Sequence, residues 1–193
     1  QVAVACIALG AICPMIAGEF DFSVGYTIGL LAIIGANTAQ HTDSAVLVIA
    51  SVLLSGILIG LINGCISVLL RISSTVVTLG MGLVYYGVNM AISDGRTITG
   101  NIPEILKVIA KTKFLNFNLS VWIIVVMALV LWYVMERTPF GKQIYAVGLC
   151  ERAAYLSGIR TKFTKILSFA LCDVCIAMGA LFLLGQAGSA APN

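Results

Sequence analysis

Charged residues are scarce in this chain. Asp, Glu, Lys and Arg make up 10% of its 193 residues, whereas a soluble domain carries about 25%. A chain so poor in charge cannot cover a water-exposed surface, and its mean hydropathy is +1.07. These absences exclude an ordinary soluble domain and predict an all-α, polytopic bundle of membrane-spanning helices.

The motifs of common enzyme sites are also missing. The sequence has one histidine, His41, and contains no H-E-x-x-H, no G-x-S-x-G and no G-x-x-x-x-G-K-[ST]. Metalloprotease, serine hydrolase and P-loop nucleotide sites are therefore unsupported. The formal net charge of only +3 argues against nucleic acid as a partner. We predict that this chain is not an enzyme.

Cysteine is present, but not in a pattern that favours chemistry. Five of the six cysteines lie inside apolar runs, where cysteine behaves as a small hydrophobic residue. Cys172 and Cys175 form a C-x-x-C, which is compatible with a metal or redox site. No second cysteine pair accompanies it, and His41 is distant in the sequence. We predict a packing role and no bound metal.

Apolar runs of spanning length predict about six transmembrane helices. The chain also opens inside an apolar run without Met and ends without a charged tail, which indicates part of a longer membrane protein. The predicted spans are Val2–Ala17, Phe22–Ala39, Ala45–Leu70, Ile72–Ile92, Leu119–Met135 and Ile166–Leu184.

The distribution of Lys and Arg predicts an orientation. Loop 136–165 holds six basic residues and Arg71 falls on the same side, whereas segment 93–118 on the other side holds four. The bias places loop 136–165 in the cytoplasm and segment 93–118 outside. Within the outer segment, Pro103 followed by apolar residues and lysines four apart predicts a short amphipathic helix, and a solvated connector is the alternative.

Glycine recurs at helical spacing. Gly56, Gly60 and Gly64 repeat every fourth residue, and Gly25 and Gly29 repeat the interval earlier in the chain. Such stripes let a second helix backbone approach closely, so they predict tight helix packing. Asn63 lies beside the first stripe, where its amide can form a hydrogen bond to another helix.

Carboxylates interrupt the apolar runs at two places. Glu19 and Asp21 follow Gly18, which predicts a discontinuous helix near Gly18–Asp21 that lines a cavity. A short surface loop with Asp21 and Ser23 capping the next helix is the alternative. We interpret Asp173, in the last span, as a shallow aspartate that reaches the interface; a path-lining or ion-paired aspartate is the alternative.

Three stretches resemble the permease subunits of bacterial sugar ABC importers of the ribose, xylose and autoinducer-2 type. They are AGEFDFSVG (17–25), GLINGCISVLLRISSTVVTLGMGLVYYGVNMAISDGRTI (60–98) and TPFGKQIYAVGLCERAAYLSGIRTKFTKILSFAL (138–171). The third stretch is the most specific. The sequence departs from the family pattern at Glu19-Phe20, Ser74-Thr75, Arg152 and Asp173, which leaves the substrate open.

The resemblance implies a single permease domain over 1–193, as a fragment of a subunit with about ten spans in the bacterial cytoplasmic (inner) membrane. It implies an ATP-binding subunit that holds ATP and Mg, a second identical or related permease subunit, and a periplasmic or lipid-anchored sugar-binding protein. This chain would then bind no cofactor itself, and would move a sugar or sugar-like solute by alternating access.

The match also predicts where the ATPase acts. We expect residues 150–159 to form a coupling helix that docks on the ATPase, with Gly158 ending it. The candidate coupling residues are Tyr145, Glu151, Arg152, Ala153, Ala154, Leu156 and Gly158.

An uncharged sugar requires a path lined by hydrogen-bonding groups rather than by a ladder of charges. The candidate path residues are Asp21, Ser23, Asn63, Thr75, Thr78 and Asn89. Two transport alternatives remain: a branched-chain amino-acid ABC permease, and an ion-coupled secondary transporter that uses Glu19, Asp21 and Asp173. A membrane scaffold is a third, but it leaves the match of the docking loop unexplained.

Overall fold

A computed structural model describes residues 1–99, 102–114 and 117–191. Helices dominate these residues, and one antiparallel pair of two-residue strands joins α5 to α6. The elements are α1 (Val2–Ile16), α2 (Val24–His41), α3 (Ala45–Leu70), α4 (Ser74–Ser93), α5 (Glu104–Lys111), β1 (Lys113–Phe114), β2 (Phe117–Asn118), α6 (Leu119–Arg137), α7 (Pro139–Leu149), α8 (Glu151–Leu156) and α9 (Thr161–Ala187).

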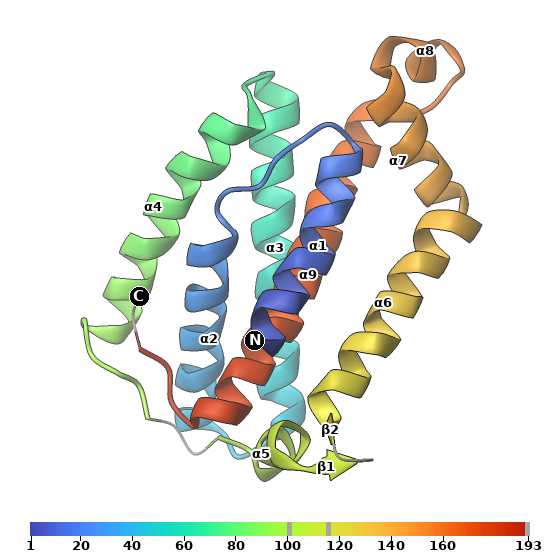
Figure 1. The fold of residues 1–193 in the computed structure, drawn as a ribbon. Coiled ribbons are helices and arrows are strands. Elements are labelled where there is room, and N and C mark those ends of the chain that lie inside the picture. The colour runs from blue at the N-terminus through green and yellow to red at the C-terminus, as the bar shows by residue number, and fades with distance from the viewer. Residues whose placement is uncertain (100–101, 115–116, 192–193) are drawn as a thin grey trace.

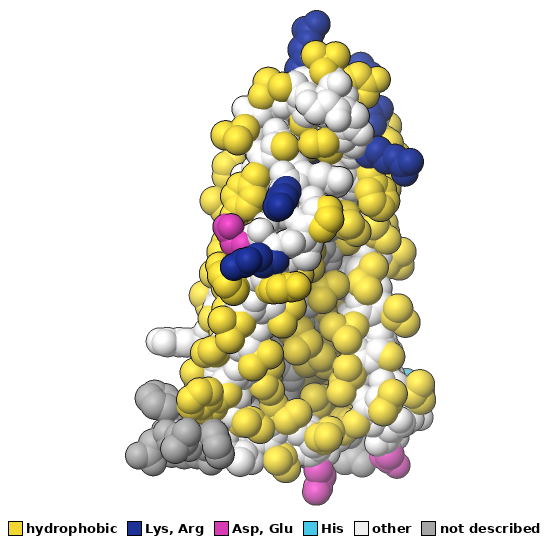
Figure 2. Space-filling model, turned by 90° about the vertical axis from the view of Figure 1, so that its right-hand side faces the viewer, with side chains coloured by type: hydrophobic (Ala, Val, Ile, Leu, Met, Phe, Trp, Pro, Cys, Tyr) yellow, Lys and Arg dark blue, Asp and Glu magenta, His cyan; other side chains and the backbone are white. Residues whose placement is uncertain are grey.

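Helix α9 is the centre of the bundle. In its most apolar 18-residue stretch 67% of the residues are buried, against 28% in α3 and α4 and 17% in α6. Figure 1 shows α1 and α3 against α9, with α2 and α4 on one side and α6 on the other. The outer helices leave apolar side chains exposed along their length, as Figure 2 shows for one face. Such a surface suits lipid or a second subunit.

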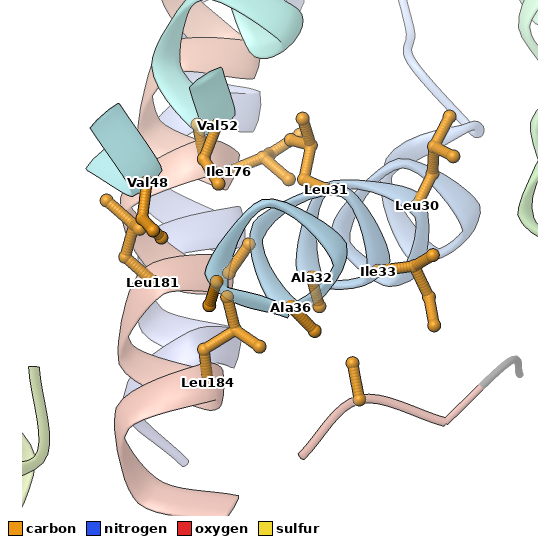
Figure 3. Close-up of a cluster of buried hydrophobic side chains, with 14 of the residues drawn as sticks. Leu30, Leu31, Ala32, Ile33, Ala36, Val48, Val52, Ile176, Leu181 and Leu184 are labelled. Carbon is orange, nitrogen blue, oxygen red and sulfur yellow. The ribbon is translucent and has the colours of Figure 1, made fainter. Parts of the chain in front are cut away.

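The core between α2, α3 and α9 is made of aliphatic side chains. Leu31 and Ala36 from α2 meet Val48 and Val52 from α3, as Figure 3 shows. Ile176, Leu181 and Leu184 close the cluster from α9. Small residues such as Ala36 let the helices approach, while the leucines and valines fill the space between them.

Glycines set the spacing of α3 against α9. A Cβ on Gly56, Gly60 or Gly64 would lie 2.6–2.9 Å from atoms of Asp173, Ala177, Phe169, Ala170 and Ile166. The partner residues run backwards along α9 as the glycines run forwards along α3, so the two helices are antiparallel. A Cβ on Gly29 would lie 3.6 Å from Nδ2 of Asn89, which is an ordinary contact. A Cβ on Gly25 would meet no other group within 4 Å among the described residues. The packing predicted for Gly25 is therefore not made within this part of the chain.

Four helices are long and apolar enough to cross a membrane: α3, α4, α6 and α9. They correspond to four of the six predicted spans, although α4 begins at Ser74, two residues after its predicted start, and α9 begins at Thr161, five residues before its predicted start. The first predicted span, α1, is an apolar helix of only 15 residues. The second, α2, is not among the four because polar residues such as Asn37, Thr38 and Gln40 dilute its apolar content. Each of the six predicted spans is thus a helix of the bundle, and four of these helices are both long and apolar enough to cross a membrane by themselves.

The two predicted loops lie at opposite ends of the bundle (Figure 1). One end carries α8 and the other carries α5, and we name them the α8 end and the α5 end. Helix α5 occupies most of the predicted amphipathic stretch, and its Leu106 and Ala110 are buried against α9 at Gly185. A helix packed in this way is not a solvated connector. Residues 100, 101, 115 and 116 of the predicted outer segment lie outside the described residues.

Candidate translocation and coupling sites

The chain breaks its helical path between α1 and α2. Gly18 has φ +81°, and the amides of Gly18 and Glu19 donate back to the carbonyls of Met15 and Pro14 at 3.1 and 2.9 Å. This pair of bonds is a Schellman ending, which needs a left-handed residue that glycine supplies without steric cost. Helix α1 therefore ends sharply at the α8 end, and residues 18–23 continue without regular structure.

The extended segment packs against α4 and ends at the fully buried Ser23, although Phe20 and Phe22 remain about half exposed. The amide of Phe20 donates to the hydroxyl of Ser74 at 3.0 Å, and the amide of Phe22 donates to Thr78 at 3.0 Å, one turn further along α4. The two hydroxyls replace the missing helical acceptors, as irregular backbone at membrane depth requires. The break predicted near Gly18–Asp21 is thus present, and its backbone is held against α4.

A buried network of polar side chains surrounds the start of α2. Ser23 donates its hydroxyl to Asp21 Oδ1 at 2.6 Å, and Asn63 Nδ2 donates to the Ser23 hydroxyl at 3.0 Å. Tyr85 OH donates to Asn63 Oδ1 at 2.6 Å. Asn63 lies seven residues before the end of α3, about 10 Å below it at 1.5 Å per residue. We call Asp21, Ser23, Asn63, Thr78 and Tyr85 the polar network.

Four of the six candidate path residues therefore lie together. The exceptions are Thr75, which is half-buried with its side chain outside these bonds, and Asn89, which is buried with its Oδ1 unpaired among the described residues. Sequence reasoning missed Tyr85. Its spacing of seven residues after Thr78 and four before Asn89 places all three on one face of α4, and this was the available signal.

The structure contradicts the interpretation of Asp173 as a shallow aspartate that reaches the interface. It is fully buried, and it lies about 18 Å along α9, which begins at Thr161. Neither carboxylate oxygen has a hydrogen-bond partner among the described residues. Asp173 also lies close enough to Asp21 to interact with it electrostatically. The residue therefore belongs to the interior beside the polar network and not to the interface.

The α8 end presents a compact projection built from α7 and α8. Thr138 caps α7 by accepting from the amide of Gly141 at 3.3 Å, and Gly148 lies against the carbonyl of Ile16 at the end of α1. Helix α8 ends in a second Schellman pair, in which Gly158 has φ +83° and the amide of Ile159 donates to Ala154 at 3.1 Å. The helix predicted near 150–159 is thus found at Glu151–Leu156.

The candidate coupling residues differ in what they offer to a partner. Leu156 is 78% exposed and its neighbour Tyr155 is 69% exposed, whereas Ala154 is only 5% exposed. Glu151, Arg152, Ala153 and Gly158 are exposed, and Tyr145 on α7 is 38% exposed. Leu149, which sequence reasoning did not single out, is 87% exposed. The projection therefore presents apolar side chains to its surroundings, while Ala154 packs inward.

An ion-pair relay connects this projection to residues 18–23, which we call the broken segment. Lys165 Nζ lies 2.8 Å from Glu19 Oε1 and 2.8 Å from Glu151 Oε2. Glu151 begins α8, and Glu19 immediately precedes Phe20 in the extended segment. These three residues help to line a cleft of about 640 Å³ at the α8 end, together with Arg71, Arg152 and Lys162. Sequence reasoning missed Lys165 because its partners lie far away along the chain.

Comparison with known proteins places these features in a family. A profile described as the permease component of branched-chain amino acid transport systems matches residues 2–193. The ribose import permease protein RbsC of Haemophilus influenzae is 31% identical over 192 residues, which cover 98% of this chain and 59% of that protein. No solved structure matches.

Two further relatives carry the name autoinducer 2 import system permease protein LsrC. The protein of Photorhabdus laumondii is 30% identical over 94% of this chain and 54% of its own length. That of Salmonella paratyphi B is 30% identical over 94% of this chain and 52% of its own length. The chain thus spans about half the length of the curated relatives that it matches. With the family profile matched from residue 2 to residue 193 and four helices fit to span a bilayer, this chain belongs to the family of permease components of branched-chain amino acid transport systems and is a multi-pass membrane protein.

Proposed function

We propose that the full-length protein is the membrane-spanning permease of an ABC importer that moves a sugar or sugar-like solute across the bacterial inner membrane. The observation that carries the proposal is the projection at the α8 end. Leu149 at the end of α7 and Tyr155 and Leu156 on α8 are exposed apolar side chains at a membrane boundary, and together they form a surface that a soluble partner would cover. The partner is a separate ATP-binding subunit, which hydrolyses ATP with Mg, and this chain does no chemistry itself.

The polar network supports a solute with hydroxyl groups. Ser23, Asn63, Thr78 and Tyr85 offer hydroxyl and amide groups that can exchange hydrogen bonds with a sugar as the spans rock between inward-open and outward-open states. The names of the relatives, which include ribose and autoinducer 2 import permeases, point the same way. A second permease subunit frames the path, and an external binding protein delivers the solute.

The docking surface is tested by substituting an exposed residue. Leu156→Glu in the full-length protein is expected to abolish co-purification of the ATP-binding subunit in mild detergent, because a charge replaces the most exposed apolar side chain of α8. The matched control is Val108→Glu, an equivalent change of a 53% exposed residue at the α5 end, and it should leave the complex intact. Ala154→Glu is unsuitable, since Ala154 is buried and the variant would disturb α8 itself.

The solute class is tested by uptake. Proteoliposomes that hold the permease, its ATPase and its binding protein should take up a labelled pentose only when ATP is supplied on the side of the membrane where the ATPase lies. Accumulation of leucine instead of pentose would favour the amino-acid importer. Uptake that follows a sodium or proton gradient without ATP would overturn the proposal in favour of an ion-coupled transporter.

A further inference from the structure

Lys165 lies between α8 and the broken segment, which both move in the proposed transport cycle. It lies one turn into α9, and its side chain is only 14% exposed. One ion pair reaches Glu19, which is 17% exposed, and the other reaches Glu151, which is 52% exposed. A single ammonium group thus touches both the projection and the broken segment, while its own backbone is fixed in the central helix.

The segment beyond Glu19 continues this contact into the bundle. Phe20 is held by Ser74 and Phe22 by Thr78, both through backbone amides at 3.0 Å. Ser23 then joins Asn63 of α3 in the polar network. Because residues 18–23 form no regular structure, their position depends on these few bonds more than on helical hydrogen bonding. A displacement of α8 can therefore reach the polar network through the ion pairs of Lys165 with Glu151 and Glu19, and then through the backbone from Glu19 to Ser23.

We propose that Lys165 is the positioning residue that couples movement of α8 to the broken segment and so to the translocation path. The inference rests on the proposed function and deepens it by naming the side-chain link between ATPase docking and the path. A lysine suits this role because its ammonium group can hold two carboxylates at once, and its flexible stem lets both bonds persist during small shifts. Two discrete arrangements of the relay are expected, one for each state of the transporter.

The structure joins three segments that lie far apart in the sequence, since the amide of Phe20 donates to Ser74 on α4 and Glu19 pairs with Lys165 on α9.

The test uses the full-length complex in proteoliposomes and measures ATP hydrolysis and solute uptake together. Lys165→Met keeps the apolar stem but removes the charge. We expect it to retain the ATPase subunit while solute moved per ATP falls about ten-fold or more, which corresponds to about 1.4 kcal/mol of lost coupling. Lys165→Arg should keep most of the coupling. Lys162→Met, at the same end of α9 but with no ion pair to an acidic side chain among the described residues, should match the wild type.

A second pair of variants separates coupling from folding. Glu151→Gln removes only the half of the relay on α8, and because Glu151 is half exposed the fold does not depend on it. It should also lower the uptake per ATP without loss of assembly. Reversing all three charges, with Glu19→Lys, Glu151→Lys and Lys165→Glu, should recover coupling that Lys165→Glu alone destroys.

The outcomes are distinct. If the wild-type complex transports solute with ATP but Lys165→Met and Glu151→Gln keep the wild-type ratio of uptake to hydrolysis, the inference is wrong and the proposed function stands. If Lys165→Met fails to assemble, Glu151→Gln alone decides, and a normal ratio would again overturn the inference. A wild-type complex without ATP-driven uptake would overturn both.

Discussion

Gly60 offers the sharpest test of the helix packing. A Cβ at this position would lie 2.6 Å from the carbonyl oxygen of Phe169 and 2.7 Å from Cα of Ala170, and all of these obstructing atoms are backbone. Ordinary contact begins near 3.4 Å, so Gly60→Ala requires α3 and α9 to separate by about 0.8 Å. Backbone atoms cannot rotate away as a side chain can. The cost is therefore spread along the whole contact between the two helices.

The expected loss is about 1–3 kcal/mol, the usual range for overpacking a close contact. The net loss for Gly60→Ala is smaller by about 1 kcal/mol, because alanine stabilises a helix relative to glycine. The assay is thermal unfolding of the full-length protein in detergent, followed by size-exclusion chromatography of the soluble fraction. Gly87→Ala on α4, where no other group among the described residues lies within 4 Å, serves as the matched control and should be neutral or stabilising. Equal midpoints for the two variants would show that α3 and α9 do not meet through Gly60.

Two further predictions concern the broken segment and the polar network. Tyr85→Phe should lower the free energy of unfolding by about 1–3 kcal/mol, because it leaves the buried Asn63 carbonyl without its donor. Tyr86→Phe, on the more exposed neighbouring ring, should change the unfolding midpoint little. Equal midpoints for the two variants would remove Tyr85 from the network. Gly18→Ala should cost about 1–2 kcal/mol because φ is +81°, and Gly25→Ala, which meets no other group within 4 Å and has no such φ, should not. A neutral Gly18→Ala would contradict the sharp ending of α1.

Sequence reasoning succeeded where the signal is local. The apolar runs predict the membrane class because their composition alone decides whether a helix prefers lipid. The stripe of Gly56, Gly60 and Gly64 predicts a close helix partner, since four-residue spacing fixes one face. Gly18 and Gly158 mark the ends of α1 and α8 because only glycine takes the left-handed conformation without cost. These inferences require no knowledge of distant residues.

The depth of a side chain could not be predicted in the same way. Asp173 was assigned to the interface because the apolar run begins near Ile166, but the helix itself begins at Thr161. The charged residues at the start of α9 do not prevent helix formation. They only lower the local mean hydropathy, so the apolar run begins later than the helix. Ala154 was similarly taken as a docking residue, although tertiary packing turns it inward and leaves Tyr155 and Leu156 to face outward.

A reader of the sequence alone can predict a bundle of apolar helices with a break near Gly18, a glycine stripe on one helix and a short helix before Gly158. Those properties follow from composition, periodicity and backbone conformation. Three features became visible only in the folded chain: the central position of α9, the bond by which Tyr85 completes the polar network, and the ion pairs by which Lys165 joins Glu19 to Glu151. The reason is physical: a contact between residues far apart in the chain depends on how the helices pack, and that packing is fixed by all of their surfaces together.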